Sequence, residues 1–305
     1  MTQAAQAEAA APRGSLVAAV VILLCGIVCL DSMNVFVRLL LERYSTVELT
    51  AYRNTIGMVP SLIYLWWAGE LKGGVARLKL RQWPLGLSRG VMVAVAQLCY
   101  YLALGHMEFA TAAALVYTLS LFTVALSIPI LGERVGPWRW GAVLLGFAGA
   151  MLILRPGTQA FQLYAAFPLI AAFFYALTIV TARRIDAEVS SAVIYLYSSV
   201  AAAVCMVGYA LLTGAFSPIA LNGDLIMITA MGLCGGTGVL LLLIAVRKAS
   251  PSVLAPFNYF GMISAFVLGW VVFGEAPFST LFPGVLLIVG AGLLILWRER
   301  RKRGT

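Results

Sequence analysis

Long apolar stretches, interrupted by short polar segments, run along nearly the whole chain of 305 residues. A helix that crosses a bilayer needs about 20 mostly apolar residues, and each stretch is close to that length. The pattern therefore predicts an all-α integral membrane protein whose connections are too short to hold a soluble domain. The ten expected transmembrane helices cover residues 16–41, 46–69, 83–105, 109–131, 137–155, 160–182, 190–213, 222–246, 251–273 and 278–297.

Two distant segments share one plan. Residues 103–154 contain two predicted helices joined by a turn at Gly132-Glu133, and residues 245–296 contain two joined at Gly274-Glu275. We interpret this correspondence as an internal duplication. It divides the chain into a first repeat at 16–155 and a second repeat at 160–297, with five helices in each.

The distribution of Lys and Arg predicts the orientation. Only 11% of the residues are charged, against about 25% in a typical soluble domain. With the N-terminus in the cytoplasm, sixteen Lys and Arg residues lie on the inside and three on the outside. This positive-inside bias predicts that both termini are cytoplasmic. Residues 1–15 are expected to be disordered, and residues 298–305 form a basic tail.

Five helices is an odd number, so the second repeat is expected to enter the membrane upside down relative to the first. Inverted repeats related by an axis in the membrane plane are typical of alternating-access transporters. In such proteins the substrate binds near the midplane, at the interface between the repeats. The fold prediction is therefore two inverted five-helix repeats around a central cavity.

Polar and aromatic side chains gather at corresponding depths in helices that the duplication pairs. Each polar group inside the hydrocarbon region needs a partner, so hydrogen bonding between helices explains any one of them. As a set, we interpret them as the lining of a substrate chamber. The set consists of Asp31, Asn34, Gln97, Tyr100, Tyr101, Tyr117, Ser120, Phe174, Tyr175, Thr178, Phe257, Asn258 and Tyr259.

Asp31 is the only acidic residue deep within a predicted span. A carboxylate there is costly, so it is expected to face the interior of the bundle with a partner. The sequence leaves two interpretations open: a proton or ammonium site, or a structural ion pair with Arg53. Arg89, near the cytoplasmic end of its span, is expected to extend its side chain to the interface.

Small residues one helical turn apart occur in the spans 83–105 and 222–246. They allow close approach of helix backbones, and tight packing is the simpler interpretation. The alternative is that these helices slide or bend, and a proline within 251–273 adds a further place to bend. The residues expected to serve packing or gating are Gly86, Gly90, Gly232, Gly236 and Pro256.

Other chemistry finds little support in the sequence. The five cysteines lie in apolar runs, without metal-ligand spacing to the single histidine, and are expected to be small buried hydrophobes. No nucleotide loop or nucleophile–base arrangement is present, so neither a cofactor, a metal nor enzymatic activity is expected. Glu133 and Glu275 lie on opposite faces under the inverted topology, and each is expected to cap the next helix.

The repeated pattern of an apolar helix, Gly-Glu and a glycine-rich helix occurs as LGERVGPWRWGAVLLGFAG and FGEAPFSTLFPGVLLIVGAG. It resembles both halves of the drug/metabolite transporter superfamily in its ten-helix, EamA-domain branch, as does Arg53 in AYRNTIG. The resemblance is greatest to the YddG-type aromatic amino-acid exporters. It implies a basket of ten helices around a central cavity. The chain lacks the proline that the resemblance implies near Tyr117-Thr118, which leaves open whether this helix bends.

These observations predict a secondary transporter in a bacterial inner membrane. It would export small metabolites, with aromatic or other neutral amino acids as preferred substrates, since Tyr and Phe faces can stack on a ring. Export of cationic or amphipathic drugs, with Asp31 as the charge partner, is the alternative, and a membrane scaffold or enzyme is a further one. Strongly anionic substrates are disfavoured because no Lys or Arg is predicted at the centre of the cavity. The expected partners are the substrate, protons and lipid, without nucleic acid and without a required oligomer.

Overall fold

The structure is a computed structural model that describes residues 13–69, 80–132, 137–154, 163–182, 184–186, 188–219, 222–248, 257, 260–275 and 281–303. Helices dominate these residues, and no strand occurs among them. The helices are α2 (Arg13–Leu40), α3 (Thr46–Ile56), α4 (Met58–Trp67), α5 (Trp83–Leu104), α6 (Phe109–Val116), α7 (Leu119–Leu131), α8 (Pro137–Leu154), α9 (Phe167–Ala182), α10 (Ser191–Thr213), α11 (Asn222–Lys248), α13 (Phe260–Phe273) and α15 (Gly284–Arg303). A 3₁₀ turn, η4 (Leu163–Ala166), leads into α9.

Within the described residues, six helical segments are long and apolar enough to cross a membrane. They are Val17–Leu40, Trp83–Leu104, Phe109–Leu131, Tyr164–Ala182, Ser191–Thr213 and Gly223–Ala245. Two shorter apolar helices, Leu144–Ile153 and Phe260–Phe273, accompany them. The protein is therefore a multi-pass helical membrane protein.

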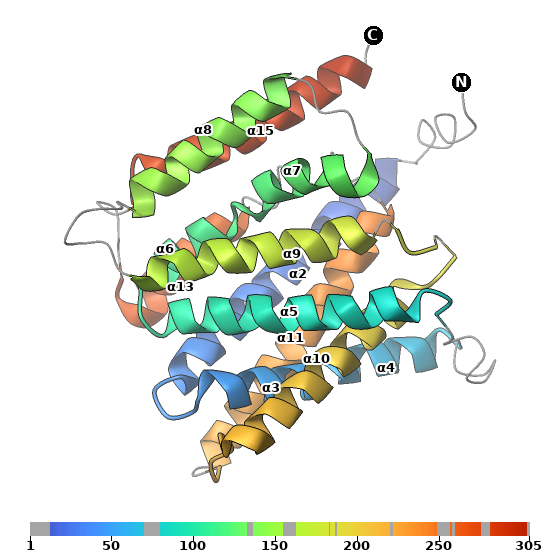
Figure 1. Ribbon diagram of the computed structural model, residues 1–305, viewed down its shortest axis with the longest axis vertical. Coiled ribbons are helices and arrows are strands. Elements are labelled where there is room, and N and C mark those ends of the chain that lie inside the picture. Colours follow the sequence, from blue (N-terminus) through green and yellow to red (C-terminus); the bar gives the residue numbers. More distant parts are fainter. Residues whose placement is uncertain are drawn as a thin grey trace.

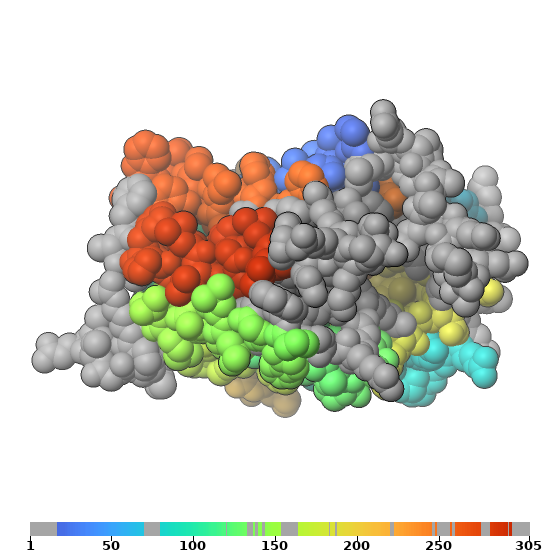
Figure 2. Space-filling model, turned by 90° about the horizontal axis from the view of Figure 1, so that it is seen from above, coloured from blue at the N-terminus to red at the C-terminus, as the bar shows by residue number. Residues whose placement is uncertain are grey.

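The helices pack in a consistent set of neighbours (Figure 1). α2 lies against α11 and α13, while α5 lies against α9 and α10. α3 contacts α10 and α11, and α7 contacts α9. α8 and α15 form a pair at one edge of the molecule, and Figure 2 shows them side by side on the surface. α5 also contacts α2 and α6, and α6 contacts α9, so these four helices are neighbours.

Small residues permit the closest helix crossings, as expected for helices in lipid. A Cβ added at Gly236 in α11 would lie 2.2 Å from the Gly57 carbonyl oxygen. At Gly90 in α5 it would lie 2.4 Å from the Ser198 carbonyl oxygen of α10. Gly86 and Gly232 are similarly restricted, by Leu80 at 2.7 Å and by Ile56 at 2.5 Å. Any larger residue at these positions has to displace the neighbouring atoms.

Two predicted spans are interrupted. The span 46–69 divides at Gly57 into α3 and α4, and the span 109–131 divides at Tyr117-Thr118 into α6 and α7. No proline stands at the second break; the Thr118 hydroxyl donates instead to the Leu115 carbonyl at 2.6 Å, and the Thr118 amide bonds the same carbonyl. Such back-bonding from Thr tightens and bends helices. The break therefore forms without a proline.

The ends of the chain differ from the expected boundaries. α2 begins at Arg13, inside the stretch 1–15 that was expected to be disordered. α15 continues to Arg303, so the basic tail extends the last helix. The glycine-rich sequence of the span 222–246 lies within one continuous helix, α11. Tertiary packing against α2 and α3 explains this, because it outweighs the low helix propensity of glycine.

Candidate functional site

A cluster of tyrosines lies where four elements meet in the middle of the bundle. Met33 of α2 and Tyr100 and Tyr101 of α5 belong to one apolar core. Tyr117, at the α6–α7 break, and Phe174 and Tyr175 of α9 pack against it. Tyr100 and Tyr101 are almost fully buried, at 5% and 0% exposure. We refer to Tyr100, Tyr101, Tyr117, Phe174 and Tyr175 as the central aromatic cluster.

Asp31 lies on the face of α2 that borders this cluster. It is 4% exposed, and it is close enough to Tyr100 and Tyr117 to interact with both electrostatically. The Ser264 hydroxyl of α13 also lies near its carboxyl group. Its Oδ2 has no hydrogen-bond partner in the described part of the chain, and neither does Oδ1 of the buried Asn34 one turn further along. This face of α2 therefore presents unused acceptors.

Arg53 approaches the cluster from α3. Its side chain is 3% exposed and interacts electrostatically with Tyr101, Tyr175 and Tyr195. The guanidinium donates to Asn54 Oδ1 at 3.0 Å and to the Gly235 carbonyl at 3.4 Å, and it also bonds the Tyr195 side chain. Its Nε has no partner among the described residues. The sequence also allowed a structural ion pair between Asp31 and Arg53. That alternative is wrong, because the ion pairs found among the described residues are Arg38–Glu275 and Arg43–Asp224. Different elements hold the two groups: Asn54 and α11 fix Arg53, whereas Asp31 faces α13.

Gln97 takes part in the packing of α3 against α5. Its side chain accepts a hydrogen bond from Asn54 Nδ2 at 2.6 Å, and Asn54 also bonds the Thr50 carbonyl at 2.9 Å. Both amides are buried, at 3% and 0% exposure. The contact gives Gln97 a role in joining the two helices. Because Asn54 also binds Arg53, the pair helps to fix the guanidinium.

Thr178 is engaged within α9. Its hydroxyl donates to the Tyr175 carbonyl at 2.7 Å, and its own carbonyl accepts from Arg89. Arg89 also donates to the Thr181 hydroxyl at 3.3 Å and is 6% exposed. Contrary to expectation, Arg89 therefore does not reach the interface, since the carbonyl and hydroxyl of α9 bind it inside the bundle.

The remaining predicted chamber residues divide into two groups. Phe257 lies at one end of an apolar pocket. Asn258, Tyr259 and Pro256 lie outside the described residues, as does the side chain of Ser120.

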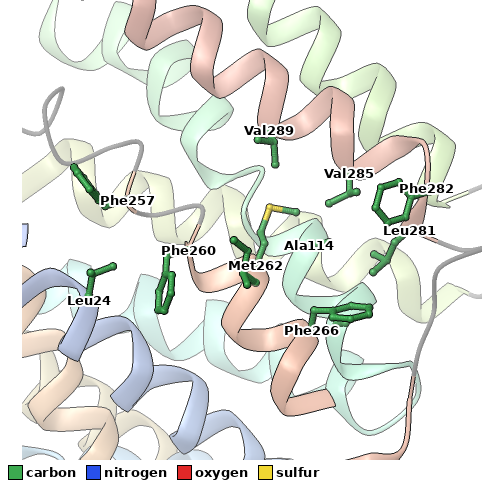
Figure 3. Close-up of a pocket in the computed structure, with 12 residues that line it drawn as sticks. Leu24, Ala114, Phe257, Phe260, Met262, Phe266, Leu281, Phe282, Val285 and Val289 are labelled. Carbon is green, nitrogen blue, oxygen red and sulfur yellow. The ribbon is translucent and has the colours of Figure 1, made fainter. Parts of the chain in front are cut away.

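The apolar pocket, of about 520 Å³, lies between α13 and α15 (Figure 3). Only apolar residues line it, and in Figure 3 Met262 stands in its middle, facing Val285 and Val289 of α15. Phe260 and Ile263 remain 38% and 62% exposed, so the pocket opens to the molecular surface. In a bilayer such a surface faces acyl chains, and no polar side chain lines the pocket to recognise a charged molecule.

Tyr117 packs against both the central core and the core that borders this pocket. Its hydroxyl lies 1.5 Å from the position that a Cβ on Gly261 would occupy. Glycine at position 261 therefore allows the Tyr117 ring to lie against α13. Tyr117 was expected in the chamber from the sequence, whereas Gly261 was given no role.

Glu275, from the second Gly-Glu motif, lies at the C-terminal end of α2. It forms an ion pair with Arg38, whose Nη1 lies 2.8 Å from Glu275 Oε2, and it accepts from the Phe109 amide at 2.8 Å. The Arg38 guanidinium also stacks over Phe273 at 4.5 Å. Glu275 thus bonds the first amide of α6 and joins α2, α6 and α13, in a role beyond the expected cap of the next helix. Glu133 lies outside the described residues.

The cysteines are only partly as expected. All five are free thiols, but none is fully buried: Cys25 and Cys205 are exposed, and Cys29, Cys99 and Cys234 are partly buried. Among the residues that the structure describes, no group of three His, Cys, Asp or Glu side chains is arranged to hold a metal ion.

Comparison with known proteins identifies the family. The model of the EamA-like transporter family matches residues 17–155 and again residues 162–297. The chain is 28% identical to the pseudopaline exporter CntI of Pseudomonas aeruginosa, over 89% of this chain and 92% of that protein. It is 29% identical to a riboflavin transporter of Rhizobium johnstonii over 71% of both chains. It is 22% identical to an S-adenosylmethionine uptake transporter of Rickettsia bellii over 89% of both.

A solved crystal structure shares the fold, with a TM-score of 0.66 and 22% identity over 93% of this chain and 97% of the other. None of these three relatives is an aromatic amino-acid exporter by name. The comparisons therefore support the family and small-molecule transport, while the finer resemblance to YddG-type exporters stays a proposal.

Proposed function

Because the chain belongs to the EamA-like transporter family, we propose that it exports small metabolites, foremost aromatic and other neutral amino acids, across a bacterial inner membrane by alternating access. The observation that carries the proposal is the central aromatic cluster with the Asp31 carboxylate beside it. Aromatic faces can stack on a substrate ring, while unused buried polar atoms can bind its polar groups. A polar group with no partner is costly in a membrane protein, so its presence points to a function.

The helix contacts support ten helices in two inverted repeats. In the predicted duplication, each helix of one repeat has a counterpart in the other. When every helix is replaced by its counterpart, the contact of α2 with α11 becomes the observed contact of α9 with α5. The same replacement converts α3 with α11 into α10 with α5, and α2 with α13 into α9 with α7. Ser45 and Ser190, at corresponding positions, cap α3 and α10 through their side chains. Substrate sites of inverted-repeat transporters lie at the interface of the halves, where the aromatic cluster is found.

The names of the relatives include both export and uptake. The direction of transport in our proposal therefore rests on the resemblance to the exporters. Asp31 favours a second candidate function, the export of cationic or amphipathic drugs, because a buried carboxylate with an unused oxygen suits a cation.

The proposal is tested with the full-length protein in liposomes loaded with labelled neutral amino acids. Saturable efflux that exceeds protein-free liposomes is expected for at least one aromatic or branched amino acid. Running the same assay with and without a pH gradient examines proton coupling. Efflux of cationic dyes without efflux of any neutral amino acid would favour the second candidate and contradict the first.

The Glu275 contacts suggest how one side of the chamber closes. With both termini cytoplasmic, Arg38 and Glu275 lie at the outer ends of α2 and α13, and their ion pair joins the two proposed repeats. We therefore expect the pair to stabilise the conformation that is closed to the outside. Both side chains are about one-fifth exposed, so solvent weakens the interaction.

Cys99 of α5 packs against the central core and serves as the reporter, with the other four cysteines replaced by alanine. Glu275→Gln is expected to speed its modification by a membrane-impermeant thiol reagent added outside. An increase of about three- to tenfold is expected, as for the loss of a partly screened, charge-assisted bidentate contact. The charge exchange Arg38→Glu with Glu275→Arg should restore the slow rate. Arg43→Gln is the control. The Arg43–Asp224 pair links the α2–α3 loop to α11, and α11 is already held against α2 by helix packing, so loss of this pair should not open the chamber. An equal increase in the control would exclude a specific outer closure.

A further inference from the structure

We propose that Arg53 and Asp31 are the two charged ends of one site for a zwitterion, with the carboxylate of the substrate on Arg53 and its ammonium group on Asp31. This inference rests on the proposed function and specifies how its substrates are recognised. It selects molecules that carry both charges, such as free amino acids, over amines and over carboxylic acids of the same shape.

Arg53 has the properties of an anion site. A buried guanidinium is costly in a membrane protein, and ordinarily a carboxylate partner offsets the cost. Among the described residues Arg53 has no such partner, since its hydrogen bonds go to a neutral amide, a backbone carbonyl and the uncharged Tyr195 hydroxyl. Its Nε is unpaired within the same set of residues. A carboxylate brought by the substrate would satisfy this donor and compensate the charge.

Asp31 has the complementary properties. It is buried on α2, its Oδ2 lacks a partner among the described residues, and Oδ1 of neighbouring Asn34 is also unpaired. An ammonium group carries three donors and no acceptor, so it matches a place where acceptors are unused.

The central aromatic cluster connects the two charged residues. Tyr100 interacts electrostatically with Asp31 and with Tyr175, and Tyr175 interacts with Arg53. Tyr101 also faces Arg53, and its hydroxyl lies 3.9 Å from the Met33 sulfur on α2. The two charges thus border one apolar, aromatic region from α2 and from α3. A substrate that spans them would place an apolar side chain against the tyrosines.

Arg89 is a second buried guanidinium and provides a matched control. Its Nη1 donates to the Thr178 carbonyl and to the Thr181 hydroxyl of α9, and its own Nε is unpaired in the described part of the chain. Among the described residues, Arg53 interacts with three tyrosines. Arg89 instead bonds two threonines of α9. Replacing Arg89 removes a similarly buried charge without touching the aromatic cluster.

The test measures binding to the purified full-length protein in detergent, as the rise in thermal unfolding temperature with L-phenylalanine, phenethylamine or 3-phenylpropionate. The wild type is expected to bind phenylalanine about ten- to a hundredfold tighter than either analogue, the effect of a charge-assisted hydrogen bond to a buried partner. Arg53→Gln should abolish the preference for phenylalanine over phenethylamine. Asp31→Asn should abolish the preference over 3-phenylpropionate. Arg89→Gln should preserve both.

If Arg53→Gln fails to fold, Arg53→Lys retains the charge but loses the planar fork that binds a carboxylate through two parallel bonds. It is expected to weaken phenylalanine and 3-phenylpropionate while leaving phenethylamine unchanged. The inference is overturned if the wild type transports amino acids but the variants weaken all three ligands equally, or if Arg89→Gln removes a preference. Absence of any amino-acid transport by the wild type would instead refute the proposed function.

Discussion

Gly236→Ala is expected to lower the stability of the folded protein strongly, because the added methyl group meets backbone on the facing helix. Its Cβ would lie 2.2 Å from the Gly57 carbonyl oxygen and 2.9 Å from the Gly57 Cα. No side chain can turn aside at this contact, so α11 has to move away from the α3–α4 break. Overpacking of this kind costs about 1–3 kcal/mol or more. We expect a clear fall in thermal unfolding temperature and in the yield of monodisperse protein.

Gly208→Ala is the matched control for this prediction. Gly208 lies within α10, and a Cβ there would meet nothing within 4 Å. Because alanine is the better helix former, Gly208→Ala should match or slightly exceed the parent in stability. A Gly236→Ala variant as stable as Gly208→Ala would contradict the close approach of α11 to the α3–α4 break.

Gly261→Ala is expected to abolish most transport while leaving the fold largely intact. The new Cβ would coincide with the Tyr117 hydroxyl, 1.5 Å away, and the Tyr117 ring carbon that carries the hydroxyl is 2.5 Å away. The contact is with the far end of a side chain, so Tyr117 can swing out of the central cluster and spare the backbone. Displacement of about 1 Å at a site that positions substrate can lower rates by about a hundredfold. Efflux from liposomes and the unfolding temperature, measured together, separate the two effects.

Gly269→Ala on the same helix serves as the comparison. Its Cβ would make only ordinary contacts, at 3.8 Å, with Ala110 and Phe109 of α6. We expect parental transport from this variant. If Gly269→Ala loses transport to the same extent, α13 tolerates no added methyl group at either position. That result would contradict a specific role for Tyr117.

Most of the central cluster could be found from the sequence. Tyr100, Tyr101, Tyr117 and Tyr175 were selected because polar aromatic residues recur within apolar runs, and they do meet in the structure. Hydrophobic length also located the long apolar helices. These features are local, since a span is defined by its own residues and its own capping signals. Ser45 with Glu48, for example, forms the capping box that its sequence indicates.

Contacts between distant segments were not predictable in the same way. Glu275 and Arg38 are 237 positions apart, and no pattern in either segment names the other as its partner. Asp31 and Arg53 were paired from the sequence because their charges are opposite and their predicted depths similar. Depth leaves the rotation of a helix unspecified, and rotation decides which neighbour a side chain faces. The sequence left the bend at Tyr117-Thr118 open, because a hydroxyl back-bond takes the role expected of a proline.

The central claim, a chamber reached from each side of the membrane in turn, is tested most directly through Cys99. This native thiol packs against the central aromatic cluster and interacts with Tyr175. Replacing Cys25, Cys29, Cys205 and Cys234 by alanine leaves Cys99 as the only cysteine. The measurement is its labelling in right-side-out and inside-out vesicles by a membrane-impermeant thiol reagent, with and without a transported amino acid. We predict labelling from both sides and protection by the amino acid from both. Labelling from one side only, or without protection, would contradict an alternating-access chamber at this position.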